Sequence, residues 1–181
     1  MKLTRADIRR LLENDGYKTF DENGNPASIP VAEQRRRAME SACEWGYVDL
    51  ASELHQMGVD IAANTELLRI AADAHQHEIA LFLIQMGADV NGRSEQFGQP
   101  PIMDAAGSGA LAVFELLIAH GADMTAVCDD GTSALDWARN GKNTIENMDW
   151  VRTDEIVADY DTIIAILDSD ETRANAEPIR I

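Results

Sequence analysis

The chain has 181 residues, 45% of them hydrophobic, which is sufficient for one domain with a sizeable core. Its 32 acidic and 15 basic side chains give a formal net charge of −17, which argues against binding to nucleic acid or anionic membranes. The sequence has no apolar run near the ~18 residues of a membrane helix and no signal-peptide core at its N-terminus, so we expect a cytoplasmic protein without membrane contact.

Residues 1–29 are predicted to form an N-terminal helical cap and linker. An amphipathic helix through Ile8, Leu11 and Leu12 precedes a turn-rich stretch over residues 21–26. We interpret this segment as a polar cap on the apolar structure that follows it. The alternative is an arm that binds a partner.

A five-residue motif occurs three times in the middle of the chain. It reads Gln-Met-Gly-Val-Asp at 56–60, Gln-Met-Gly-Ala-Asp at 85–89 and Ala-His-Gly-Ala-Asp at 119–123. The glycines lie 29 and 34 residues apart, and each follows an apolar run with helical spacing. A pair of small residues ends 15 residues before each glycine, as Ala-Cys, Ala-Ala and Ala-Ala. This pattern predicts a recurring unit of two closely packed helices.

The recurring unit resembles the ankyrin repeat, which has about 33 residues, a Thr-Pro-Leu-His-x-Ala signature, a β-turn and two helices. The best copy starts at Gly98, with Pro100 in the place of Thr and Met103 in the place of His. A second front end starts 33 residues later at Gly131, and the earlier copies are weaker. The resemblance implies an all-α ankyrin-repeat solenoid of about four helix-turn-helix repeats over residues 30–142, with short β-hairpin loops and helical caps.

The link between the first two copies is shorter than the next link. Thirteen residues separate Gly58 from Ala71, whereas eighteen separate Gly87 from Ala105. We therefore expect the first junction to lack a full β-hairpin.

Residues 143–181 are predicted to contain an insertion, a completing C-terminal helix and a polar tail. The insertion, over 143–158, interrupts the fourth repeat, and the apolar stretch 163–167 supplies the second helix that this repeat lacks. Such an insertion belongs on a loop at one face of the stack. It either packs locally and buries Trp150 or forms a binding loop.

Patterns that carry catalysis are weak in this sequence. His75 and His77 lie two residues apart, which on a helix points them in different directions, and no third ligand is placed near them. There is no glycine-rich phosphate loop or nucleophile elbow, and Cys43 and Cys128 belong to distant repeats. We therefore predict a non-catalytic protein with no cofactor, metal or disulfide. The alternative is an enzyme whose metal is held by one of these histidines and carboxylates of the insertion.

The acidic charge is concentrated in the repeats and in the C-terminal extension. Residues 41–142 carry 4 basic and 15 acidic side chains, a net charge of −11, and residues 143–181 carry −7. Such a field speeds the encounter with a cationic partner, although it also serves solubility.

Proteins similar to ankyrin repeats bind partners through hairpin tips and the inner helices of the concave face. Carried onto this sequence, that surface comprises Glu44, Trp45, Asp73, Gln96, Phe97, Gln99, Ser108, Asp129, Asp130, Thr132, Trp137 and Asn140. Aromatic anchors in polar surroundings are where interfaces concentrate binding energy. For the two tryptophans, partial burial between repeats is the alternative.

We expect a protein–protein interaction module, monomeric when free, that binds a basic protein and inhibits it by covering its surface. An immunity or antitoxin protein that neutralises a toxin is a specific case of this function. A structural subunit of a constitutive complex is the alternative.

Overall fold

The computed structural model describes residues 18–20, 26–28, 31–148 and 154–176. Within these residues the chain forms a small hairpin and eight helices. The elements are β1 (Lys18–Phe20), β2 (Pro26–Ser28), α2 (Val31–Trp45), α3 (Val48–Gln56), α4 (Glu66–Asp73), α5 (His77–Gln85), α6 (Pro101–Ser108), α7 (Leu111–Ala119), α8 (Ala134–Glu146) and α9 (Asp154–Ala176). The helix expected through Ile8, Leu11 and Leu12 lies outside the described residues.

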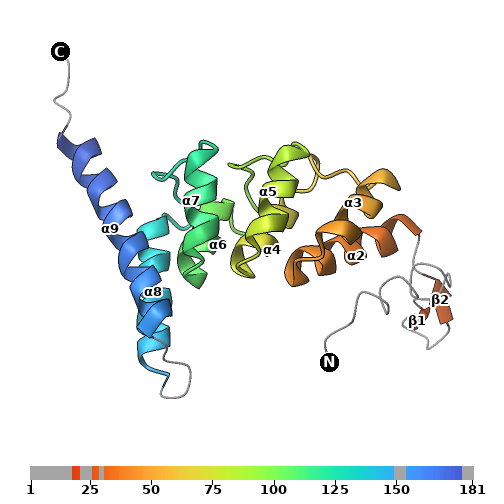
Figure 1. The fold of residues 1–181 in the computed structure, drawn as a ribbon, viewed down its shortest axis with the longest axis horizontal. Coiled ribbons are helices and arrows are strands. Elements are labelled where there is room, and N and C mark those ends of the chain that lie inside the picture. The colour runs from red at the N-terminus through yellow and green to blue at the C-terminus, as the bar shows by residue number, and fades with distance from the viewer. Residues whose placement is uncertain (1–17, 21–25, 29–30, 149–153, 177–181) are drawn as a thin grey trace, which may run out of the picture.

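The helices form four pairs that stack along one direction (Figure 1). The first helices of the pairs, α2, α4, α6 and α8, contact one another in one row, and the second helices, α3, α5, α7 and α9, form a parallel row. Such a stack buries a continuous core because each pair covers the apolar face of its neighbour. This arrangement confirms the predicted all-α solenoid of four helix-turn-helix repeats.

The small-residue pairs lie in the core, between the helices. All six residues of the three pairs, at 42–43, 71–72 and 105–106, have no exposed surface. Small side chains let the neighbouring helices approach closely, as the sequence pattern predicts. Burial raises the pKa of the Cys43 thiol to about 12, and both Cys43 and Cys128 are free thiols.

The turn inside each of the first three pairs contains a residue in the left-handed region. Gly46 and Gly109 have φ of 73° and 75°, and His75 takes the same place in the second pair with φ of 59°. A side chain in this conformation is strained. The His75 ring nitrogen Nε2 lies 3.0 Å from the carbonyl oxygen of Ser108, a contact that holds the turn to the next pair. One of the two candidate metal ligands is thus part of the turn inside the second pair.

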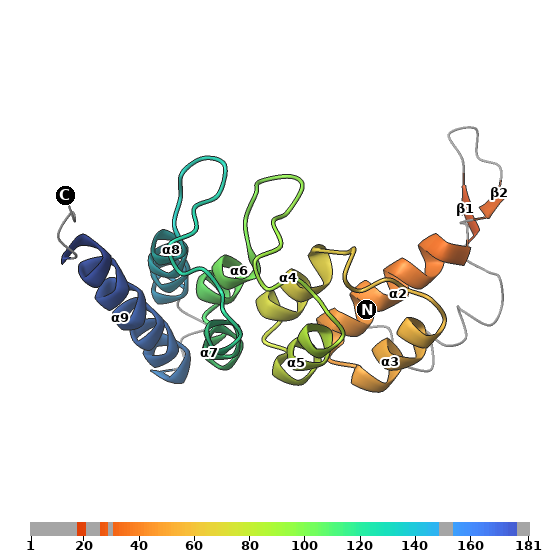
Figure 2. The same ribbon diagram turned by 90° about the horizontal axis from the view of Figure 1, so that it is seen from above.

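The connections between the pairs differ in length and shape. The connections over residues 86–100 and 120–133 project as long loops from the row of first helices, whereas residues 57–65 do not project (Figure 2). The second loop carries a bridge between Val127 and Ser133. The expectation that the first junction lacks a full hairpin is confirmed.

The C-terminal pair is longer than the others. Helix α8 has 13 residues where α4 and α6 have 8, so the predicted insertion begins as a continuation of α8 rather than as a loop. Helix α9 has 23 residues, buries Ile163 and Leu167, and forms the second helix of the last pair. The predicted burial of Trp150 lies outside the described residues.

Helices α6, α8 and α9 meet at a close contact around Gly141. The Tyr160 hydroxyl donates a hydrogen bond of 2.7 Å to the carbonyl oxygen of Gly107. A Cβ atom at position 141 would lie 2.1 Å from that oxygen and 2.7 Å from the Tyr160 hydroxyl. A Cβ atom at these distances would overlap both oxygen atoms, so α8 needs glycine at this position.

We therefore expect Gly141→Ala to destabilise the protein, although alanine favours a helix by up to about 1 kcal/mol over glycine. Displacing α8 from α6 should outweigh that gain and give a net loss of about 2 kcal/mol in the free energy of unfolding. Urea denaturation followed by circular dichroism measures this loss. Asn140→Ala, at an exposed position of the same helix, is the control and should change stability by less than about 0.5 kcal/mol. A Gly141→Ala variant as stable as the control would contradict the close contact.

Candidate protein-binding surface

The row of first helices and the two projecting loops form one side of the stack (Figure 2). All twelve residues predicted for partner binding belong to α2, α4, α6, α8 or these loops. Their exposure differs, however, because some side chains point into the stack. The exposed members are Glu44, Asp73, Gln96, Phe97, Asp129, Asp130 and Asn140.

Two of the predicted carboxylates border a hollow between α2 and α4. Glu44 and Asp73 line this hollow of about 480 Å³, together with Arg37 and Glu40. Partial burial raises the pKa of the Glu40 carboxyl, against the attraction of nearby Arg36. This hollow, on the side of the first helices, therefore presents carboxylates to which a cationic group of a partner could bind.

Two further carboxylates of the predicted set lie at the surface of the loop over residues 120–133. Asp130 accepts hydrogen bonds from the Cys128 thiol and from the backbone N–H and hydroxyl of Thr132. These bonds, led by the one from Cys128, lower the pKa of Asp130 to about 2, so this carboxylate stays ionised at neutral pH. Asp129 lies 3.7 Å from the guanidinium of Arg93, an exposed pair that contributes little to stability.

The structure corrects the placement of Gln99. This side chain is only 4% exposed, and its amide donates a hydrogen bond of 2.8 Å to Asp104 Oδ1. Its backbone N–H donates to the Ser94 hydroxyl. Gln99 is therefore nearly buried, holds the base of a loop to α6, and offers little exposed surface to a partner.

The predicted aromatic residues fall into two groups. Phe97, near the tip of its loop, is 55% exposed. Trp45 and Trp137 are half-buried, and the Trp137 ring lies over Gly107, where a Cβ atom would come within 2.8 Å of it. The alternative of partial burial between repeats therefore describes Trp137, and Phe97 is the exposed aromatic side chain of the three. Ser108 is half-buried, and its hydroxyl donates 2.9 Å to the Asp104 carbonyl oxygen.

A polar network that sequence reasoning missed connects α4 to α6. The Arg69 guanidinium donates to both carboxylate oxygens of Asp104, at 2.8 and 3.2 Å, and to Glu66 at 2.6 Å. Arg69 is 14% and Asp104 9% exposed. Burial raises the pKa of Asp104 even though Arg69 and Gln99 bind its charged form. The signal in the sequence was Arg69 itself, which stands where the repeat signature has His.

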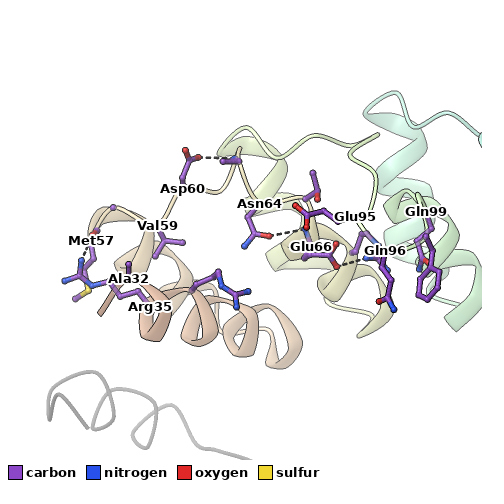
Figure 3. Close-up of a pocket in the computed structure, with 16 residues that line it drawn as sticks. Ala32, Arg35, Met57, Val59, Asp60, Asn64, Glu66, Glu95, Gln96 and Gln99 are labelled. Carbon is purple, nitrogen blue, oxygen red and sulfur yellow. Dashed lines mark hydrogen bonds and ion pairs between the residues drawn. The ribbon is translucent and has the colours of Figure 1, made fainter. Parts of the chain in front are cut away.

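A second hollow lies beside the short first link, and we call it the link groove. Its volume is about 770 Å³, and its walls are the start of α2, the link over residues 57–65, and loop residues 95–99 (Figure 3). Met57 and Phe97 are the most exposed large hydrophobic residues that line it. The signal in the sequence was the shortened spacing at the first junction.

Within 18–20, 26–28, 31–148 and 154–176, no group of three or more His, Cys, Asp or Glu side chains is arranged to hold a metal ion. The helices in this part of the chain are each too short or too polar to cross a bilayer.

Stacked helix pairs with projecting loops define a repeat protein of the α-solenoid class. Residues 68–148 match the family model described as ankyrin repeats in three copies, and this segment of the chain belongs to the ankyrin-repeat family. Ankyrin repeats are protein–protein interaction modules, and the chain therefore carries such a module.

Curated relatives share the repeats over part of their length. The chain is 28% identical over 138 residues to a B-cell lymphoma 3 protein homolog of Mus musculus, which covers 73% of this chain and 29% of that protein. It is 30% identical over 114 residues to the ankyrin repeat and KH domain-containing protein mask-1 of Caenorhabditis elegans, covering 60% of this chain and 4% of that protein. It is also 27% identical over 113 residues to the ankyrin repeat protein nuc-2 of Neurospora crassa, covering 60% and 11%. The chain thus spans less than a third of the length of these relatives.

Proposed function

We propose that this protein binds a basic protein through the acidic side of its stack and inhibits it by covering its surface. The observation that carries the proposal is the exposure of four carboxylates on that side, Glu44, Asp73, Asp129 and Asp130. They belong to a segment whose net charge is −11, from 4 basic and 15 acidic side chains. Complementary charge steers a cationic partner onto such a face and disfavours acidic competitors.

The proposal assigns no chemistry to the chain, and its action is to occupy the partner's surface. The protein would be monomeric when free and would act in the cytoplasm, without a cofactor. Neutralising a cationic toxin is a specific case of the same binding mode. A structural subunit would differ because it would be isolated in a constitutive complex.

Affinity capture with a matched variant tests the proposal. The intact chain and a variant with Glu44→Gln, Asp73→Asn, Asp129→Asn and Asp130→Asn are immobilised in parallel and exposed to extract from the native host. We expect the intact chain to retain a protein with a basic surface that the variant loses. Retention of an acidic partner, or equal retention by both chains, would contradict the proposal.

The two loop aspartates should govern the rate of encounter. We expect Asp129→Asn with Asp130→Asn to slow association with the captured partner roughly threefold or more at low salt. The effect should vanish at high salt, because exposed charges are screened beyond about 8 Å at physiological ionic strength. Surface plasmon resonance over a salt series measures both rates.

The matched control removes the same charge from the other row of helices. Glu78→Gln with Glu115→Gln, at exposed positions of α5 and α7, should leave the association rate close to that of the intact chain. Phe97→Ala should act on dissociation instead and weaken affinity by ~2 kcal/mol. If association is equally slow in both charge variants, the net charge of the protein determines the rate, and the position of the charges on this face does not.

A further inference from the structure

We propose that the link groove receives a short extended segment of the partner, which carries an apolar side chain next to lysine or arginine. This inference rests on the proposed function, because it names the part of the partner that the module holds. The link groove exists because the first junction has no projecting loop, so a partner segment would take the place of the missing hairpin.

Among the described residues, the loop over residues 86–100 has a projecting neighbour on one side, the loop over residues 120–133. There, the Asp129 N–H donates to the Phe97 carbonyl oxygen at 3.0 Å, and the Arg93 guanidinium donates to the Val127 carbonyl oxygen at 2.7 Å. On its other side the short link leaves the open volume of about 770 Å³. On this side the loop presents Glu95, Gln96 and Phe97 to the link groove, and residues 57–65 form no second loop beside them.

Apolar surface is exposed on two walls of the link groove. Phe97 comes from the loop and is 55% exposed, and Met57 comes from the end of the first repeat and is 50% exposed. Aromatic and methionine side chains at the rim of a hollow are typical anchor positions in interfaces. A leucine or phenylalanine of the partner segment that packs against Phe97 would remove this ring from water.

The charges of the link groove select a basic segment. Two of its three cations already have anionic partners, since Arg36 pairs with Glu33 and Glu40, and Arg69 pairs with Asp104 and Glu66. Among the described residues no cation pairs with Asp60 or Glu95, which line the link groove together with Glu66.

Arg35, the third lining cation, has no carboxylate partner in the part of the chain that the structure describes. Arg35 donates to the Met57 carbonyl oxygen at 2.9 Å, at the end of the link groove away from Glu95 (Figure 3). Unpaired negative charge is offered at the loop by Glu95, where a lysine or arginine of the partner would be held beside Phe97. An acidic segment would meet Glu95 there and Asp60 on the link, and would be repelled.

The test uses a short synthetic peptide with Leu-Phe flanked on both sides by Lys-Lys, titrated into the full-length ¹⁵N-labelled chain. We expect its backbone amide shifts to map to residues 57–66 and 95–99. A peptide with glutamates in place of the lysines, and one with Ser-Ser in place of Leu-Phe, should each bind at least about tenfold more weakly.

Variants of the chain separate the two contributions. Phe97→Ala should weaken binding of the basic peptide about tenfold, whereas Val127→Ala, at an exposed position of the neighbouring loop, should not. Asp60→Asn with Glu95→Gln should weaken it roughly threefold or more, whereas Glu78→Gln with Glu115→Gln should not.

The outcomes distinguish this inference from the proposed function. Shifts confined to the hollow at Glu44 and Asp73 would overturn the link groove as the docking site and leave capture of a basic protein standing. Equal binding of the acidic peptide, or no shifts in the link groove at any peptide concentration, would overturn the inference as well. If no basic partner is captured although the peptide binds the link groove, the proposed function is overturned and the docking site is retained.

Discussion

A chain truncated after Met148 will lose its cooperative fold and aggregate. Helix α9 lies at the end of the stack and contacts α7 and α8 (Figure 1). Its residues Tyr160, Ile163 and Leu167 are at most 2% exposed, so their removal forfeits roughly 5 kcal/mol of apolar burial. This is comparable to the total stability of a typical domain, and it leaves the apolar side of the last repeat open to water.

Light scattering coupled to gel filtration and a thermal melt followed by circular dichroism will measure this outcome. Two full-length variants calibrate it. Leu167→Ala should lose about 2–4 kcal/mol, because it leaves a cavity at a buried position of α9. Ala165→Ser, on the exposed face of the same helix, should be close to neutral. A truncated chain that remains monomeric and melts like the intact one would show that α9 is dispensable.

Replacement of Arg69 by alanine will destabilise the protein by about 3 kcal/mol at neutral pH. Arg69 is the cation that binds both oxygens of the Asp104 carboxylate, and this carboxylate is 9% exposed. Without the guanidinium, the buried Asp104 carboxylate keeps the hydrogen bond from the Gln99 amide but loses its compensating positive charge. Leaving a buried charge unpaired destabilises a protein far more than breaking an exposed ion pair does. Urea denaturation measures the loss.

The pH dependence of this variant carries a defined sign. Burial raises the pKa of Asp104 in the folded protein above the ordinary value of 3.8, so protonation favours the folded state and its contribution is lost as the pH rises through the folded pKa. Arg69 opposes that rise, and its removal moves the folded pKa further upward. The stability difference between Arg69→Ala and the intact chain should therefore grow as the pH increases from about 3.8 toward neutrality.

The control for this experiment is an ion pair at the surface. Arg139 binds Asp168 at 2.8 Å, and both side chains are about half exposed. Arg139→Ala should change stability by no more than about 1 kcal/mol. If Arg69→Ala and Arg139→Ala lose the same amount at every pH, the network between α4 and α6 adds nothing beyond a surface pair.

Much of the fold could be predicted because repeats pack against their nearest neighbours. A pair of small residues and a glycine at constant spacing specify two helices and the turn that follows them, and this information is local in the sequence. The shortened distance from Gly58 to Ala71 predicted the missing hairpin for the same reason. The candidate surface followed from the same register, which places residues on the first-helix side but does not state how deeply each is buried.

The sequence by itself determined the number and order of the helix pairs, the short first link and the late second helix of the last pair. Only the tertiary structure decided that Gln99 is buried, that Arg69 meets Asp104, and that Met57 and Phe97 border one groove. These features depend on side chains from different repeats, whose separation and rotation are set by packing across the stack. Periodicity assigns a residue to a face of its own helix, whereas its partners belong to the neighbouring repeat.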